Sequence, residues 1–157
     1  MIQKLLIKCM LGLAISLSSF LTAAASIEGY WRSINERTGE QLAIIEIRKN
    51  ADNTFTGKIV YTYPSAQGKL ITHCVNCPAP YTGKPRLGLP MLTQLVEDPN
   101  RPNHYINGRM IDSLSGKTYK GKARISEDGK RLSLRGYIGV SLLGRSLVWI
   151  RANGPTP

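Results

Sequence analysis

The chain has 157 residues and carries 21 lysine and arginine residues against 10 acidic residues, which gives a formal charge of +11 at pH 7. This length suits one domain, and only three cysteines are too few for a fold built on disulfides, so a hydrophobic core must hold it together. The positive charge favours anionic partners, but it does not determine the fold.

Residues 1–25 have the pattern of a secretory signal peptide. A basic start is followed by an apolar run over residues 9–21 and by three consecutive alanines that end at Ala25. The run is shorter than the about 20 residues that a membrane-spanning helix needs. We therefore expect cleavage after Ala25, which leaves residues 26–157 as a single domain in the periplasm or secreted. A retained N-terminal anchor is the alternative.

Short alternating segments follow along the rest of the chain. Period-two alternation of apolar and polar residues is typical of strands with one buried and one wet face. We expect such strands over residues 41–49, 54–62, 117–126, 131–138 and 145–151. Residues 91–96 fit either a strand or one helical turn.

Turn-forming dipeptides punctuate these segments at Asp52-Asn53, Asn107-Gly108, Ser115-Gly116 and Asp128-Gly129. Asparagine and glycine tolerate the positive φ angles that tight hairpin turns require. Many short strands joined by regular turns indicate an all-β fold, either a sandwich or a barrel.

The segment from Pro64 to Pro90 is rich in proline and contains Cys74 and Cys77. Two nearby cysteines in an oxidising compartment usually form a disulfide. We therefore expect a structural disulfide that pins an ordered loop over one end of a barrel. A redox dithiol is the alternative, although such pairs usually open a helix, and here prolines follow.

A zinc site is a further alternative for the two cysteines, together with His73 and His104. It would require the cysteines to stay reduced, so we expect no metal and no cofactor. Neither histidine lies in a motif that would activate a nucleophile. We expect no enzymatic activity, and an enzyme of unknown type that uses the Cys74/Cys77 loop is the rival interpretation.

A set of short motifs extends over nearly all of the chain that follows the signal peptide. They are Gly29-Tyr30-Trp31, Thr38-Gly39, the stretch 83–89 (GKPRLGL), Met110-Ile111-Asp112, the stretch 115–119 (SGKTY), the stretch 134–139 (LRGYIG), Gly144-Arg145 and Trp149-Ile150-Arg151. Together they resemble the bacterial secreted family called domain of unknown function 2147. The departure is Ser113-Leu114, where that family often has an acidic-proline turn.

The resemblance implies a single antiparallel lipocalin-like (calycin-like) β-barrel of about eight strands and a location in the cell envelope, with no established activity. Lipocalin-like barrels often begin with Gly-x-Trp and end with a basic residue across that indole. Trp31 and Arg151 match this pattern. We expect their contact to close the barrel, with a cation–π attraction of about 0.5–2 kcal/mol.

The outward faces of the predicted strands are basic. If the alternation holds, they carry Lys58, Lys120, Lys122, Arg124, Arg131 and Arg135, which would merge into one patch on neighbouring strands. Such a patch would attract anionic lipid headgroups, at about 1 kcal/mol per basic residue, or an envelope glycan. We expect no nucleic acid partner, because no aromatic residues are interleaved to stack on bases.

The expected inward set is Phe55, Ile59, Tyr61, Tyr119, Ala123 and Leu134. Glycines at the inward positions 57 and 121 would either leave room for a ligand or let the sheet bend. The apolar connection 136–144 should lie at a barrel end, where it would line a ligand mouth, touch a membrane or pack against the long loop.

Barrels of about eight strands either are filled by their own side chains or hold one small ligand. The leading hypothesis is that the barrel binds a small apolar or amphipathic molecule without catalysis. The alternative is an envelope-interaction protein with a filled barrel and a basic outer face. The sequence leaves the ligand and the oligomeric state open.

Overall fold

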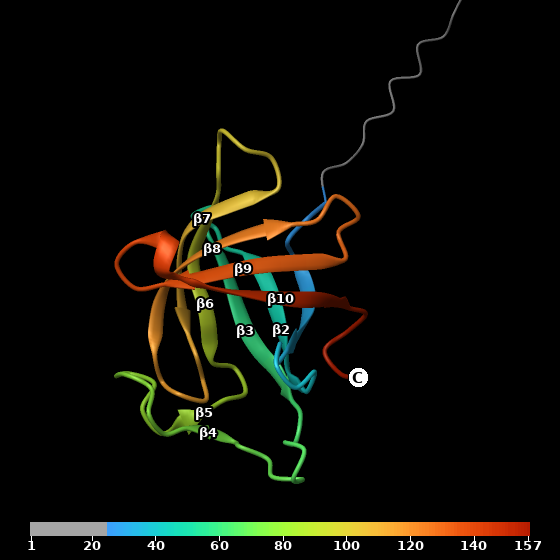
Figure 1. The fold of residues 1–157 in the computed structure, drawn as a ribbon, viewed down its shortest axis with the longest axis vertical. Helices are drawn as coiled ribbons and strands as arrows, with labels where there is room; N and C mark the ends of the chain where they lie inside the picture. The colour runs from blue at the N-terminus through green and yellow to red at the C-terminus, as the bar shows by residue number, and fades with distance from the viewer. Residues whose placement is uncertain (1–24) are drawn as a thin grey trace, which may run out of the picture.

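The computed structural model describes residues 25–157, so the predicted signal peptide lies outside the described residues except for Ala25. Eight antiparallel strands form a closed barrel (Figure 1) in the order β1-β10-β9-β8-β7-β6-β3-β2. This confirms the predicted all-β barrel. The strands are β1 (Gly29–Ile34), β2 (Gln41–Lys49), β3 (Phe55–Thr62), β6 (Pro90–Glu97), β7 (His104–Ile111), β8 (Thr118–Ile125), β9 (Arg131–Tyr137) and β10 (Arg145–Ala152).

The connection between β3 and β6, residues 63–89, leaves the barrel and is called here the long connection. It contains a two-stranded sheet of β4 (His73–Cys74) and β5 (Lys84–Pro85), seen at the bottom of Figure 1. One 3₁₀ turn, η1 (Ser141–Leu143), lies between β9 and β10. Within residues 25–157, no helix has the length and apolar content to cross a membrane.

The predicted strands are all present, and residues 91–96 belong to a strand. Two strands, β1 and β7, were not predicted. The prediction of a hairpin turn at Asn107-Gly108 is wrong, because these residues form an irregularity inside β7. The pairing of β7 with β8 shifts register between Tyr105 and Gly108, and Asn107 has a φ of 61°. A Cβ atom at Gly108 would lie 2.8 Å from the Leu95 side chain, so close packing rather than chain reversal requires this glycine.

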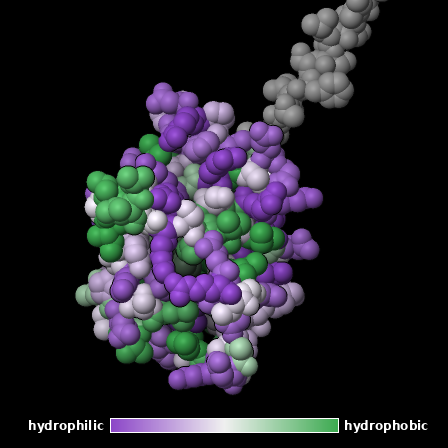
Figure 2. All heavy atoms as spheres, viewed as in Figure 1, coloured by the Kyte–Doolittle hydropathy of each residue, from purple (hydrophilic) through white to green (hydrophobic). Residues whose placement is uncertain are grey.

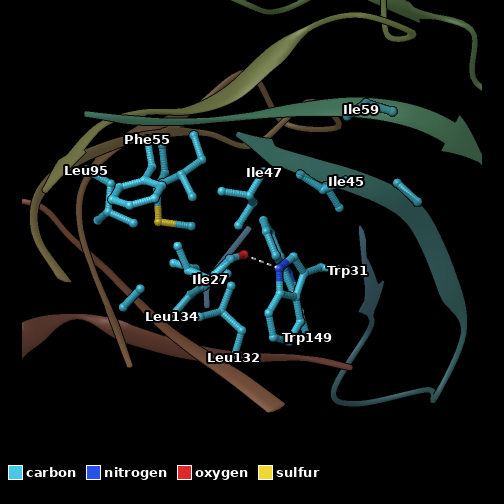
Figure 3. Packing of buried hydrophobic residues seen from close by; sticks show 14 of the residues in the cluster. Ile27, Trp31, Ile45, Ile47, Phe55, Ile59, Leu95, Leu132, Leu134 and Trp149 are labelled. Atoms are coloured by element: carbon cyan, nitrogen blue, oxygen red, sulfur yellow. Dashed lines mark hydrogen bonds between the residues drawn. The ribbon is translucent and has the colours of Figure 1, made fainter. Parts of the chain in front are cut away.

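Large side chains fill one half of the barrel interior. Trp31 and Trp149 are the largest of the fully buried residues, and Leu132 and Leu134 pack with them. Ile27, which precedes β1, enters the interior, and its carbonyl oxygen accepts a hydrogen bond of 2.8 Å from Trp31 Nε1, drawn as a dashed line in Figure 3. The N-terminal segment therefore plugs this half of the barrel.

Arg151 closes the same end from outside. Its Cζ atom lies 3.9 Å from the centroid of the Trp31 ring, so the predicted contact is present. The guanidinium also donates hydrogen bonds to three backbone carbonyl oxygens, those of Ser26 (2.6 Å), Glu28 (2.6 Å) and Gly129 (2.9 Å). We call this the closed end. The opposite, open end carries the long connection and the connections β1–β2, β7–β8 and β9–β10.

Trp31→Ala should lower the free energy of unfolding by about 3–5 kcal/mol, because the ring is fully buried. Arg151→Met should cost less, because its guanidinium is partly exposed and water can replace part of its hydrogen bonding. Urea unfolding followed by circular dichroism measures both. A Trp31→Ala variant as stable as the wild type would contradict this account of the closed end.

Candidate ligand-binding site

The open half of the barrel contains a cavity of about 520 Å³. Its size is within the range of about 300–1,000 Å³ that is common for small-molecule sites. Each of the eight barrel strands contributes at least one lining residue. Four residues, Ala43, Ile59, Met110 and Trp149, belong both to this lining and to the buried core cluster, so they form the boundary between the filled half and the hollow half.

The deeper wall of the cavity is mainly apolar. Met91 and Met110 contribute flexible, polarizable side chains that can adapt to a ligand. Further apolar groups come from strands on all sides of the barrel, among them Ala43, Ile59, Tyr119 and Leu147. A wall of this kind favours an apolar ligand body, because burial removes its surface from water.

The rim of the cavity is polar and charged. It includes Glu36 and Arg37 from the β1–β2 connection, Asp112 from the β7–β8 connection and Arg145 from the start of β10. Both signs of charge are present, so the rim suits a polar or charged head group. The site as a whole has apolar groups inside and charged groups at the open end. This distribution of polarity matches that of an amphipathic ligand.

Arg86 is the one arginine of the lining that is buried, with 4% of its surface exposed. Its Nε donates a hydrogen bond to Ser113 Oγ (3.0 Å) and its Nη1 donates one to the Ile71 carbonyl oxygen (2.9 Å). Burial lowers the pKa of Arg86, and the nearby Asp112 carboxylate acts in the opposite direction. Because a guanidinium has five N–H donors and two are used here, other N–H groups of Arg86 remain that can donate hydrogen bonds to an anion in the cavity.

The long connection is fastened to the β7–β8 connection by several contacts. The bond from Arg86 to Ser113 is one of them. Another is Gly116, with a φ of 76°, where a Cβ atom would lie 1.9 Å from the Asn76 carbonyl oxygen, so no larger residue fits. The long connection is therefore an ordered part of the open end, as its prolines predicted.

Cys74 and Cys77 form a disulfide, and both belong to the buried core cluster. Their burial supports a structural role, because reactive cysteines are usually accessible. The zinc alternative fails on geometry. His73 lies in the long connection at the open end, whereas His104 begins β7 at the closed end.

The predicted interior residues divide between the two halves. Ile59 and Tyr119 line the cavity. Phe55, Ala123 and Leu134 belong to the buried core cluster and not to the cavity lining. Phe55 is held there by an edge-to-face contact with Tyr105, with ring centroids 5.4 Å apart.

Tyr61 does not face the interior, which corrects the prediction. The register between β2 and β3 shifts, so that Ile59 pairs with Ile45 while Tyr61 pairs with Ile44. Ile45 shares its face of the sheet with Trp31, whereas Ile44 shares the opposite face with Arg32. The extra residue in β3 therefore turns Tyr61 outward.

The inward glycines do not create the cavity. A Cβ atom at Gly57 would lie 3.1 Å from Ile45 Cγ2, and one at Gly121 would lie 3.0 Å from Met110 Cγ and Sδ. Neighbouring side chains thus fill the space at both positions, and neither glycine lines the cavity. The interpretation that they leave room for a ligand is wrong.

The predicted basic patch forms only in part. Lys120, Lys122 and Arg124 on β8 lie beside Arg131 and Arg135 on β9, and Lys122 pairs directly with Arg135. Lys58 on β3 is separated from β8 by β6 and β7, so it does not belong to this patch. Arg109 on β7 pairs with Lys120 and extends the patch, which the sequence analysis missed because it did not predict β7.

Sequence reasoning also missed Arg86, Met91, Met110 and Leu147 as cavity residues. Arg86 lies within the GKPRLGL motif of residues 83–89, which marked the position without giving it a role. The alternation of β7 could have indicated that Met110 faces the interior, but Asn107-Gly108 was interpreted as a turn, so the strand was not predicted.

Comparisons with known proteins agree with this architecture. The sequence model of a family described as "Uncharacterized protein conserved in bacteria (DUF2147)" matches residues 29–151. Among solved structures, the chain is similar to protein HP1028 from Helicobacter pylori, described as belonging to the lipocalin family, with 17% identity and a TM-score of 0.67. That match covers 82% of this chain and 84% of the other, and at this identity it shows the fold alone. No curated protein matches the sequence.

Arg86→Met should loosen the long connection without unfolding the barrel. Losing hydrogen bonds from a charged donor costs about 1.5–3 kcal/mol, which corresponds to about tenfold to a hundredfold faster opening. Hydrogen exchange should show this at the amides of residues 83 and 86, which bond to carbonyls of Cys74 and Thr72. The exposed Arg131→Met is the control and should leave both amides unchanged. Unchanged exchange in Arg86→Met would contradict the fastening role.

Proposed function

Because the chain belongs to the DUF2147 family and its barrel has the lipocalin fold, we propose that it binds one small amphipathic molecule in the open half of the barrel. The observation that carries the proposal is the cavity of about 520 Å³ above Trp149, with an apolar wall and a charged rim. The apolar part of the ligand would lie against Met91, Met110 and Leu147. Its polar part would lie near Arg86 and Arg145.

The expected affinity follows from the apolar wall. A tail of about fourteen carbons gains about 11 kcal/mol at about 0.8 kcal/mol per buried methylene group. Association costs at least about 4 kcal/mol in lost freedom. At most about 7 kcal/mol is left, which corresponds to a dissociation constant in the micromolar range or weaker.

The proposed role involves binding without a chemical step, in the periplasm or outside the cell. The location rests on the signal-peptide pattern of residues 1–25. The burial of Cys74 and Cys77 supports this role over the rival enzyme that would use the cysteine loop.

A second candidate function is binding of an anionic lipid or envelope glycan by the basic patch on β7, β8 and β9. The pairs Lys122–Arg135 and Arg109–Lys120 place like charges directly opposite each other, which costs stability unless anions lie nearby. Against this, Arg135 already donates hydrogen bonds to the carbonyl oxygens of Ser141 and Leu142. The cavity is therefore the favoured site.

Filling the cavity should abolish binding. Leu147 lines it, while the next residue on β10, Val148, does not and pairs with the exposed Ser133. Leu147→Trp should weaken binding of myristate and of N-phenyl-1-naphthylamine by at least about tenfold, because the indole occupies the space of the ligand. Val148→Trp adds the same ring to the outer face and should bind as the wild type does.

Fluorescence of the naphthylamine probe and its displacement by myristate measure both variants, and thermal unfolding confirms that each is folded. A wild type that binds neither ligand would contradict the proposal. Equal losses of binding in Leu147→Trp and Val148→Trp would contradict the location of the site.

A further inference from the structure

Large apolar side chains are exposed at one end of the molecule. In the described part of the chain, nine large hydrophobic residues are exposed, and all of them lie in connections of the open end. Leu142 (85%), Leu143 (79%) and Val75 (71%) are the most exposed. In Figure 2 hydrophobic surface gathers at the left, over the β9–β10 connection of Figure 1, and at the bottom, over the long connection, with a further area to the right of centre over the barrel wall. Such a concentration marks an interaction surface.

The β9–β10 connection is held in this exposed form. Leu142 and Leu143 belong to η1, which contributes no buried residue. From the barrel side, Arg135 donates hydrogen bonds to the carbonyl oxygens of Ser141 (2.7 Å) and Leu142 (2.9 Å). The backbone of the connection is therefore fixed to β9 while its leucines project into solvent.

Positive charge accompanies these apolar groups. The open end carries five exposed basic residues: Arg37, Lys69, Lys84 and Lys117 in its connections, and Arg145 at the start of β10. Three acidic residues lie there as well: Glu36, which is exposed, Glu40, and Asp112, which accepts hydrogen bonds from Ser115 and the Leu114 backbone. The turns of the closed end carry the exposed acids Asp52, Glu127 and Asp128 together with the exposed basic residues Arg101 and Lys130, and none of the nine apolar residues lies there.

We propose that the open end docks on the surface of an anionic lipid bilayer, with Leu142 and Leu143 inserted among the acyl chains and the basic side chains against the headgroups. Projecting apolar tips flanked by lysine and arginine are the chemistry that binds such interfaces. The exposed residues lie on three separate connections, an arrangement that a fluid bilayer can accommodate more readily than a rigid partner surface can. Docking in this orientation turns the cavity mouth toward the membrane.

This inference goes beyond ligand binding and does not depend on it, because the inserted residues Leu142 and Leu143 lie outside the cavity lining. A protein that docks but binds no myristate would refute the proposed function alone. A protein that binds myristate but does not dock would refute the present inference alone.

Two tryptophan reporters test which end meets the bilayer. Leu142→Trp places an indole in η1, and Ala51→Trp places one in the exposed β2–β3 turn at the closed end. Both are mixed with vesicles of equal phosphatidylglycerol and phosphatidylcholine whose acyl chains are brominated. When the vesicles are added, the emission of Leu142→Trp should shift to the blue and be quenched by at least about half. The emission of Ala51→Trp should change no more than the wild-type emission does.

Affinity measurements separate the open end from the outer face of the barrel. In vesicle sedimentation, Leu142→Ser with Leu143→Ser should weaken binding at least tenfold, and raising the salt from 0.05 to 0.5 M should weaken wild-type binding at least tenfold. Neutralising the outer face with Lys122→Gln and Arg124→Gln should change binding by less than threefold. Pure phosphatidylcholine vesicles should bind much less protein.

Three results would overturn the proposal. The first is equal quenching of both reporters. The second is binding that is lost on neutralising the outer face but kept in the leucine double variant, which would move the contact to the basic patch. The third is a wild-type dimer that binds no vesicles and that the leucine double variant converts to a monomer, which would make the open end a contact between two copies of the chain.

Discussion

The packing of Arg151 on the Trp31 ring closes one end of the barrel, and the other properties of the molecule depend on this one-sided closure. The guanidinium joins the N-terminal segment, the β8–β9 turn and the indole, while Ile27 enters the interior beneath them. The two tryptophans and the leucines of β9, all fully or almost fully buried, then fill this half. Stability is concentrated at one end, and the opposite end does not need to be filled.

The open end is hollow, and its parts act together. The long connection is tied down through Arg86 and through the close contact at Gly116, so the rim of the cavity is defined by ordered backbone. The mouth, the charged rim and the exposed apolar tips all face the same direction. An amphipathic ligand that enters from a lipid surface is the proposed function that makes use of all three features.

The sequence predicted the architecture well because strand alternation and turn residues are local signals, as the match between residues 41–49 and β2 shows. Two local irregularities defeated the same reasoning. A register shift turned Tyr61 outward, and Asn107 adopted its positive φ inside a strand rather than in a turn. Arg86 could not have been assigned from its neighbours in sequence, because its partner Ser113 lies 27 positions away and only folding brings them together.

The most direct test of the half-filled barrel is a methyl NMR titration with myristate, using protein labelled at methionine and isoleucine methyl groups. Met91 and Met110 line the cavity, whereas Ile27 and Ile125 are buried outside it. The account predicts saturable shifts of both methionine methyl signals, with the signals of Ile27 and Ile125 nearly unchanged. Methionine signals that stay fixed while myristate binds elsewhere, or while it does not bind at all, would contradict it.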